Sequence, residues 1–473
     1  MAGLKSLFGD TALYGLSSIV ARLLNFALTP LLTMVLSKSE YGVNSLLYVS
    51  IAFLMVILTY GFETAYFRFS QKKGFEESRV YSTAMWSLII STVVFLIVLL
   101  ICYVPISQLL HLSDRPYLIL WMGWIVAMDA VCAVPFARLR AQRKARRFII
   151  IKISQIGINF LLCYVIFLFL PNVGYKLPEW KVGWVLFSNL LASAFMMILL
   201  APEFFAIKKI FDFKIWKTMI LFGFPLLLAG LPGIANEMAD RFFIEYLMPI
   251  STSKEDVGTY SAIYKLSIFL ILFNQAFRYA AEPYFFKKSE NTKNQMAIVL
   301  RLFTGILCIG MVAVLSGLDG IKFFIDSKYW DSLPLLYILL LANVFLSMNT
   351  QISMWYKLTD KTYLGLYITM VGLLITVVGN IFLIPILGIE GAAWTTLFSY
   401  FGMTVLSILL GQFHYRVPYD FGKIILYLVS GIILGWVASK NMVNYFYSFG
   451  ALVSMIIIVI FSERKIFVNK LMK

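Results

Sequence analysis

The residues that could do chemistry in this sequence lie in two apolar stretches between Phe222 and Lys288. The first stretch carries four polar residues that share one face of a helix, at i, i+1, i+4 and i+5: Asn236, Glu237, Asp240 and Arg241. The second carries a polar stripe at about 100° per residue: Ser261, Tyr264, Lys265, Gln275, Tyr279 and Glu282. Ionisable groups inside a bilayer cost at least about 2.5 kcal/mol each, so they usually face a bundle interior or a watery cavity. The two stretches are therefore predicted to line a path through a membrane.

The first two apolar stretches of the chain also carry a stripe of polar residues on one helix face. One has a stripe centred on an arginine, at i, i+4, i+7 and i+11: Ser18, Arg22, Asn25 and Thr29. The other has a comparable stripe: Tyr48, Thr59, Glu63 and Tyr66. We therefore predict a central cavity lined by four cations: Arg22, Arg241, Lys265 and Arg278. Because guanidinium groups pair well with phosphate oxygens, an anionic head group is the expected ligand.

These cations have a second interpretation, as partners in internal ion pairs that hold helices together. The stretches contain four acids for that role: Glu63, Glu237, Asp240 and Glu282. Both interpretations hold if the pairs break when the cavity changes its opening. Asp240 and Arg241 are neighbours, so on a regular helix we expect each to have another partner. The acids are the candidates for ion coupling or gating, and the candidate substrate-binding residues are Arg22, Asn25, Glu63, Asn236, Arg241, Lys265, Gln275 and Arg278.

The composition is that of an integral membrane protein. Hydrophobic residues make up 61% of the 473 residues and charged residues 14%, against about 25% charged in a soluble domain. A bilayer core about 30 Å thick needs about 20 apolar residues per helix, and such runs follow one another almost from end to end. The runs do not alternate as the strands of a membrane barrel would.

Fourteen spans joined by short connections are predicted. They cover residues 11–36, 43–66, 80–105, 116–137, 148–170, 182–202, 216–240, 257–278, 296–317, 332–355, 363–384, 389–411, 422–441 and 443–462. An even number puts both termini on one side, and the excess of Lys and Arg in the loops of that side predicts that it is the cytoplasm. This asymmetry accounts for the formal charge of +16 and for the basic run from Arg138 to Arg147, so no nucleic-acid partner is expected.

No pattern in the sequence indicates an enzyme. There is no phosphate loop, no cluster with metal-ligand spacing and no large catalytic loop, so neither ATP use nor a metal is expected, and H⁺ or Na⁺ is the candidate coupling ion. The four cysteines lie inside apolar runs, where packing roles are expected, and the two histidines stand alone in loops. Four polar residues of the tenth and eleventh spans are predicted to form hydrogen bonds between helices: Asn343, Asn349, Gln351 and Asn380.

An internal repeat appears when the chain is laid over itself with a shift of 216 residues. Four residues at the start of the second span then meet four at the start of the eighth: Glu40, Gly42, Ser45 and Tyr48 with Asp256, Gly258, Ser261 and Tyr264. A shift of six helices keeps the orientation, so the repeats are parallel. The predicted fold is all-α, with a six-helix lobe at 1–205, a second at 206–411 around a central cavity, and a helix pair with a short tail at 412–473. Pro225 and Pro232 are expected to interrupt the seventh span.

Several short motifs, in order and over nearly the whole chain, carry a resemblance to a known family. They are Ala21-Arg22 to Leu36 with Glu40-Tyr41-Gly42, Gly61 to Arg68, Phe222-Gly223-Phe224-Pro225, Asp240-Arg241, Val257-Gly258 with Tyr264-Lys265-Leu266, Glu282-Pro283, and Gly388-Ile389-Glu390-Gly391-Ala392-Ala393. In these motifs the chain resembles the polysaccharide transporter family of the multidrug, oligosaccharidyl-lipid and polysaccharide exporter superfamily, which includes O-antigen and capsule repeat-unit flippases.

The resemblance implies a flippase of the bacterial cytoplasmic (inner) membrane. Its cavity would open alternately to either side and carry a polyprenyl-pyrophosphate-linked oligosaccharide outward, with Arg22, Arg241 and Lys265 on the pyrophosphate. The expected partners are the lipid-linked oligosaccharide, membrane lipid and other polysaccharide-assembly proteins.

Two other functions stay open. Relatives that move the peptidoglycan precursor also have fourteen spans, although they carry a richer set of cavity arginines. Drug and cation exporters of the superfamily typically have twelve spans and an acid in the first. Arg22 has the wrong sign for a cationic drug.

Overall fold

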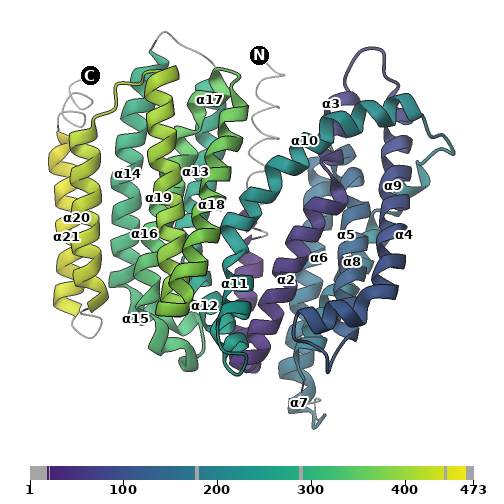
Figure 1. Ribbon diagram of the computed structural model, residues 1–473, viewed down its shortest axis with the longest axis horizontal. Coiled ribbons are helices and arrows are strands. Elements are labelled where there is room, and N and C mark those ends of the chain that lie inside the picture. The colour runs from purple at the N-terminus through teal and green to yellow at the C-terminus, as the bar shows by residue number, and fades with distance from the viewer. Residues whose placement is uncertain (1–18, 21, 176–179, 287–290, 441–444, 465–473) are drawn as a thin grey trace. The chain divides into compact units, whose positions relative to one another are not determined.

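The computed structural model describes residues 19–20, 22–175, 180–286, 291–440 and 445–464 (Figure 1). The described chain is helical almost throughout and contains no strand, which confirms the all-α prediction. It divides into two compact units, residues 1–239 and 240–473.

The first unit begins with an apolar helix, Arg22–Val35. The helices that follow are α2 Lys38–Thr59, α3 Phe62–Phe69, α4 Glu77–Leu109, α5 Tyr117–Ala141, α6 Ala145–Tyr164 with the π-helical η1 Val165–Phe169, α7 Leu170–Asn172, α8 Val182–Leu199, α9 Ala201–Phe205 and α10 Phe213–Met238.

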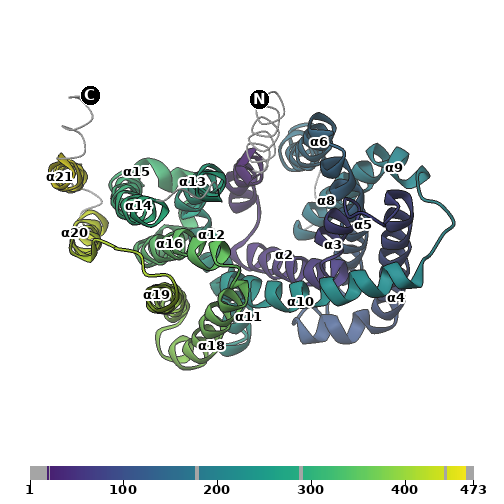
Figure 2. The ribbon, with the colours of Figure 1, turned by 90° about the horizontal axis from the view of Figure 1, so that it is seen from above.

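The second unit begins where α10 ends. Its helices are α11 Asp240–Leu247, α12 Ser253–Leu266, α13 Ile268–Phe286, α14 Thr292–Ser316, α15 Leu318–Ile321, the 3₁₀ turns η2 Lys322–Phe324 and η3 Ser327–Ser332, α16 Leu335–Ile352, α17 Met354–Leu358, α18 Thr362–Leu387, α19 Ile389–His414, α20 Phe421–Lys440 and α21 Tyr445–Ser462. Seen from above, α20 and α21 lie beside α14 (Figure 2).

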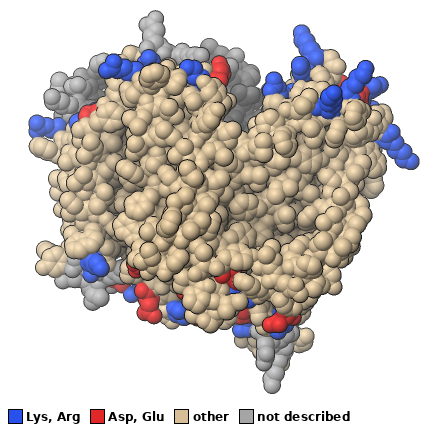
Figure 3. All heavy atoms as spheres, viewed as in Figure 1, with Lys and Arg blue, Asp and Glu red and all other residues tan. Residues whose placement is uncertain are grey.

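The long helices are membrane spans by length and composition. Eleven helices of the described chain qualify, and the bent pair α12 and α13 makes a twelfth. Two more predicted spans correspond to shorter apolar helices, Arg22–Val35 and Phe446–Ser462, so a count of fourteen stays a prediction. In Figure 3 the flanks of the helices carry few charged side chains, while Lys and Arg gather at helix ends. The protein is therefore a multi-pass integral membrane protein.

The helix α10 packs within the first unit, against α2, α3 and α4 (Figure 1). The closest approach is between Gly61, which has φ +73°, and Gly223: a Cβ on Gly223 would lie 2.5 Å from the carbonyl oxygen of Tyr60. Only glycines allow the two backbones to meet in this way.

The division of the chain after Ala239 differs from the predicted lobe boundary after residue 205. The lobes 1–205, 206–411 and 412–473 stay a prediction.

Two predicted helix shapes are corrected. Pro225 and Pro232 do not interrupt α10, which continues through both and ends at Met238. The eighth span is bent by 47° at Ser267 instead of straight, so its upstream and downstream polar residues do not form a single helical stripe. At the bend the Ser267 hydroxyl donates to the carbonyl oxygen of Tyr264 (2.7 Å) and accepts from Asn343 Nδ2 (3.1 Å), which interrupts the helical hydrogen-bond ladder.

Candidate functional site

The start of α11 places two opposite charges inside the second unit. Asp240 and Arg241 are 2% and 6% exposed. Asp240 Oδ1 accepts from the backbone nitrogen of Arg241 (3.0 Å) and from its Nη1 (2.6 Å). These neighbours therefore pair with each other, which was not expected on a regular helix, and Asp240 also has a second partner, as expected, in Tyr260. At the first turn of a helix the backbone N–H groups are free, so the carboxylate folds back onto them and meets the adjacent guanidinium.

Two tyrosines of α12 complete the surroundings of this pair. The hydroxyl of Tyr260 donates to Asp240 Oδ2 and lies 3.3 Å from Thr396 Oγ1 of α19. The guanidinium carbon of Arg241 lies 4.3 Å from the ring centre of Tyr264 and 5.2 Å from that of Tyr260. Arg241 is thus neutralised by one carboxylate and covered by two aromatic rings, a cation–π arrangement. We call Asp240, Arg241, Tyr260 and Tyr264 the buried ion-pair cluster.

The other predicted site residues of the second unit lie on both sides of the bend. Lys265 is exposed at the end of α12. On α13, Gln275 is buried and its Nε2 donates to the hydroxyl of Tyr279 (3.2 Å). Arg278 is exposed, with its guanidinium carbon 5.6 Å from the Tyr279 ring centre. The side chain of Glu282 lies outside the described residues.

The predicted site residues of the first unit do not form one group there. Arg22 and Asn25 are exposed on the helix Arg22–Val35, whereas Asn236 is buried and Glu237 half-buried in the last turn of α10. The chain leaves α10 at Ala239, so the face predicted for Asn236, Glu237, Asp240 and Arg241 is divided between α10 and α11.

Glu63 belongs to a different environment from the one predicted. The break at Tyr60 and Gly61 starts the new helix α3, and Glu63 pairs there with Arg140 in the last turn of α5. Arg140 is part of the basic run, so in this structure Glu63 is a partner of that run.

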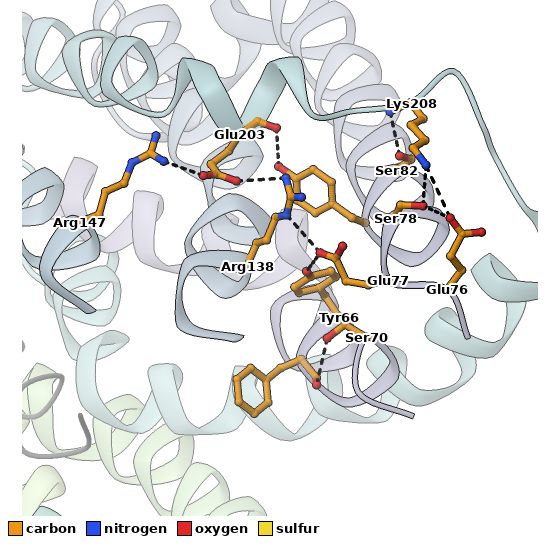
Figure 4. Close-up of polar contacts among 12 residues, drawn as sticks. Tyr66, Ser70, Glu76, Glu77, Ser78, Ser82, Arg138, Arg147, Glu203 and Lys208 are labelled. Atoms are coloured by element: carbon orange, nitrogen blue, oxygen red, sulfur yellow. Dashed lines mark hydrogen bonds and ion pairs between the residues drawn. The ribbon is translucent and has the colours of Figure 1, made fainter. Parts of the chain in front are cut away.

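A second charged network at this end of the first unit was missed by the sequence analysis (Figure 4). Glu203 of α9 is 4% exposed and accepts from Arg138 Nη1 (3.1 Å) and Arg147 Nη1 (3.0 Å). Arg138 Nε also donates to Glu77 Oε1 (3.1 Å), which accepts from the Tyr66 hydroxyl (2.7 Å). The network joins α3, α4, α5, α6 and α9, and its two arginines and two glutamates balance. A glutamate directly after the sixth apolar run was the available signal.

Asp129 is a further ionisable residue that the sequence analysis did not single out. It stands in the middle of α5 and its Oδ1 accepts from Ser193 Oγ (2.9 Å) and from Gln155 Nε2 (3.5 Å). Lys152 lies one turn before Gln155 on α6, with its Nζ 4.3 Å from the Phe136 ring centre. A carboxylate at mid-span is a candidate for ion coupling. Among the residues that the structure describes, no group of His, Cys, Asp or Glu could hold a metal ion.

Comparisons with known proteins give one family match and several likenesses of fold. The sequence profile of a family described as polysaccharide biosynthesis protein matches residues 7–289. No curated protein matches the chain. The solved structures that it resembles include the lipid II flippase MurJ in an inward closed conformation, with a TM-score of 0.76 at 14% identity over 98% of this chain and 100% of that one.

Two multidrug transporters are also similar in structure. An inward-facing MATE family transporter of the MOP superfamily gives a TM-score of 0.65 at 14% identity, covering 83% of this chain and 94% of that one. The MATE multidrug transporter DinF-BH gives a TM-score of 0.60 at 15% identity, with 87% and 96% covered. At these identities the likeness shows the fold, and the chain has the fold of these transporters.

Proposed function

Since the chain belongs to the polysaccharide biosynthesis protein family, we propose that it is a flippase that moves a polyprenyl-pyrophosphate-linked oligosaccharide from the cytoplasmic to the outer leaflet. The observation that carries this proposal is the family match over residues 7–289, which covers the first unit from residue 7 onward together with α11, α12 and α13. Its fold likeness to a lipid II flippase supports the same class of activity.

In the proposed mechanism the predicted six-helix lobes, residues 1–205 and 206–411, open a cavity alternately to either side. Arg22, Arg241 and Lys265 bind the pyrophosphate, and the polar stripes meet sugars. Arg241 is paired with Asp240 in this structure, so phosphate oxygens would have to replace that carboxylate. When a phosphate replaces the carboxylate, the buried guanidinium of Arg241 keeps a negatively charged partner. Substrate binding then does not pass through a state with an unpaired buried charge, which lowers its barrier.

The energy source in this proposal is a gradient of H⁺ or Na⁺. Glu63, Glu237, Asp240 and Glu282 were the acids expected to take part in coupling or gating, and Asp129 joins them because of its place in α5. The protein would lie in the bacterial inner membrane with both termini in the cytoplasm, next to other polysaccharide-assembly proteins.

Arg22→Ala tests the proposal at the residue that is exposed on the first helix. In a deletion strain that carries the variant, surface polysaccharide should be lost while the protein is still present in the membrane. Lys144→Ala, a change in the exposed turn before α6, is the matched control and should restore the surface polysaccharide. Wild-type export by Arg22→Ala would remove Arg22 from the site.

A peptidoglycan-precursor flippase is the second candidate, favoured by the likeness to a lipid II flippase over 98% of this chain. Depletion of the protein would then stop growth through cell-wall failure. Healthy growth without the protein, together with loss of one surface glycan, excludes this candidate as the cell's sole precursor flippase. An ion-coupled exporter of small molecules, the third candidate, predicts altered drug tolerance and no stalled glycolipid.

A further inference from the structure

The connection between α19 and α20 borders a hollow of about 510 Å³ in the second unit. Its walls come from the first turn of α14, the last turn of α19, the connection itself and the first residue of α20. The residues that matter for its chemistry are Lys293, Gln412, Arg416, Tyr419 and Phe421. None of them belongs to the candidate site described above. The hollow lies at the ends of apolar helices, which is the depth at which lipid head groups lie.

The hollow is positively charged. Lys293 and Arg416 are exposed, and no carboxylate among the described residues forms an ion pair with either of them. The nearby acids are already engaged: Arg301 of α14 donates to Asp420 Oδ2 (3.0 Å) and Glu463 Oε2 (2.8 Å). Glu463 also accepts from Lys423 Nζ (3.3 Å). Within the described chain, the two cations on the walls are therefore not paired with a carboxylate, and Lys293 Nζ lies 4.6 Å from the Tyr415 ring centre.

The walls are held in place and carry further donors. Gln412 Nε2 donates to the carbonyl oxygen of Val417 (2.7 Å), which fixes the turn that carries Arg416. Burial raises the pKa of the Tyr419 hydroxyl, so the phenol stays protonated. Tyr419 also lines a second, smaller hollow with Gln351. Gln351 is 6% exposed, and its Nε2 has no hydrogen-bond partner in the described chain.

Exposed aromatic residues occur on the wall of the hollow and at the adjoining end of α19. Phe413, next to Gln412, is 86% exposed, and Phe421 on the wall is 41% exposed. A ligand that satisfies both the cations and the rings has an anionic head and an apolar body. A phosphate diester on acyl chains has this form, and basic pockets at helix ends select such head groups.

We propose that this hollow is a binding site for the phosphate head group of an anionic membrane phospholipid. Lys293 and Arg416 pair with the phosphate oxygens, and the acyl chains lie along Phe413 and Phe421. A bound lipid at this position would attach the connection that leads to α20 and α21 to the membrane surface. The proposal does not depend on the transported substrate.

Native mass spectrometry of the purified full-length protein tests the proposal by counting bound lipids. Phosphatidylglycerol should bind in preference to phosphatidylcholine, and Lys293→Gln and Arg416→Gln should each lower the affinity for phosphatidylglycerol about fivefold. The double variant should lose the preference. Lys361→Gln is the matched control, because Lys361 lies between α17 and α18 at the same end of the unit but does not line the hollow.

The other outcomes overturn the proposal in distinguishable ways. A double variant that keeps the wild-type preference would show that the hollow is not the site. Inorganic phosphate that displaces the lipid at equal concentration would make the ligand a free anion. Polyprenyl pyrophosphate that binds through Lys293 and Arg416 while phosphatidylglycerol does not would assign the hollow to the transported lipid. Lys293→Arg and Arg416→Lys keep the charge and should bind as the wild type does.

Discussion

The buried charge of Arg241 depends on Asp240 within the second unit. A buried pair contributes little net stability because both charges lose water, but removing one partner leaves the other uncompensated, at a cost of about 3–5 kcal/mol. Tyr260 adds a hydrogen bond to the same carboxylate, so the contributions of Asp240, Arg241 and Tyr260 are coupled.

A double-mutant cycle measures this coupling. Asp240→Asn should destabilise the purified protein by about 3–5 kcal/mol, because the buried guanidinium loses its counter-charge. Arg241→Gln should have a similar effect. The double variant should be at least as stable as the less stable of the two single variants. Thermal unfolding in one detergent gives all four stabilities. A double variant whose loss equals the sum of the single losses would contradict the coupling.

Glu203 is the corresponding residue of the first unit, because it is buried between two arginines. Glu203→Gln should leave Arg138 and Arg147 without the carboxylate that they share, and should destabilise the protein by about 3–5 kcal/mol. Glu76→Gln is the control in the same region, since Glu76 pairs with Arg79 and Lys208 at the surface. The control should unfold as the wild type does. Equal unfolding temperatures for the two variants would contradict the role of Glu203.

Residue types and spacing predicted that Asp240 and Arg241 would be buried, but not that they would pair with each other. That pairing depends on a helix start at Asp240, which a continuous apolar pattern does not reveal. The Glu63 pair with Arg140 was missed for a similar reason, because the start of the new helix α3 after Gly61 is not visible in a continuous apolar pattern. Asp129 could have been found, since a carboxylate inside an apolar run is visible in the sequence.

Among the helices, α10 is attached to the first unit at a close contact between two backbones. Its attachment to the first unit depends on the contact of Gly223 with Tyr60 and Gly61, where a side chain has no room. The connection before α10 and the first turn of α10 both bond to α4: Trp86 Nε1 donates to the carbonyl oxygen of Lys208 in the connection (3.1 Å), and Trp216 Nε1 of α10 donates to Ser87 Oγ (2.9 Å).

Gly223→Ala tests this contact. The added Cβ would lie 2.5 Å from a backbone oxygen, so α10 must move, and we expect a loss of about 1–3 kcal/mol in unfolding free energy. Gly233→Ala is the control on the same helix, because nothing lies within 4 Å of a Cβ there. The control should be neutral or more stable by up to about 1 kcal/mol. An unchanged unfolding temperature for Gly223→Ala would rule out the close contact.

Hydrophobic periodicity predicted the long helices well, whereas their bends were not readable. Two prolines suggested a break in α10 that is absent, and a serine bends the eighth span without any proline or glycine nearby. The bend needs a partner from α16, Asn343, which was correctly predicted to bond between helices. Contacts of this kind join residues far apart in sequence, so local patterns do not contain them.

For the whole molecule, the order of apolar runs predicted an all-helical membrane protein, and the described helices and the fold likeness to solved membrane proteins confirm that fold class. The compact units divide after Ala239, whereas the predicted lobe boundary follows residue 205, because the place of the division depends on the helices against which α10 packs and not on the length of any apolar run. The charge bias of the loops predicts the orientation in the membrane, which labelling can test.

Cysteine labelling reports that orientation. Lys144→Cys and Ser251→Cys place thiols at exposed positions in connections predicted to lie on opposite sides of the membrane. In intact cells a membrane-impermeant maleimide should react with Ser251→Cys alone, and with Lys144→Cys after permeabilisation. Cys132, Cys163 and Cys308 are buried and give little background. The reverse labelling pattern would invert the proposed orientation.

The most direct test of flippase activity is mass spectrometry of polyprenyl-linked glycans from cells with and without the protein, combined with a probe of the leaflet that holds them. The proposal predicts that one complete repeat unit accumulates on the cytoplasmic face when the protein is absent, and that its mass identifies the cargo. If no glycolipid accumulates and no surface glycan is lost, the flippase proposal is wrong and the small-molecule exporter becomes the leading candidate.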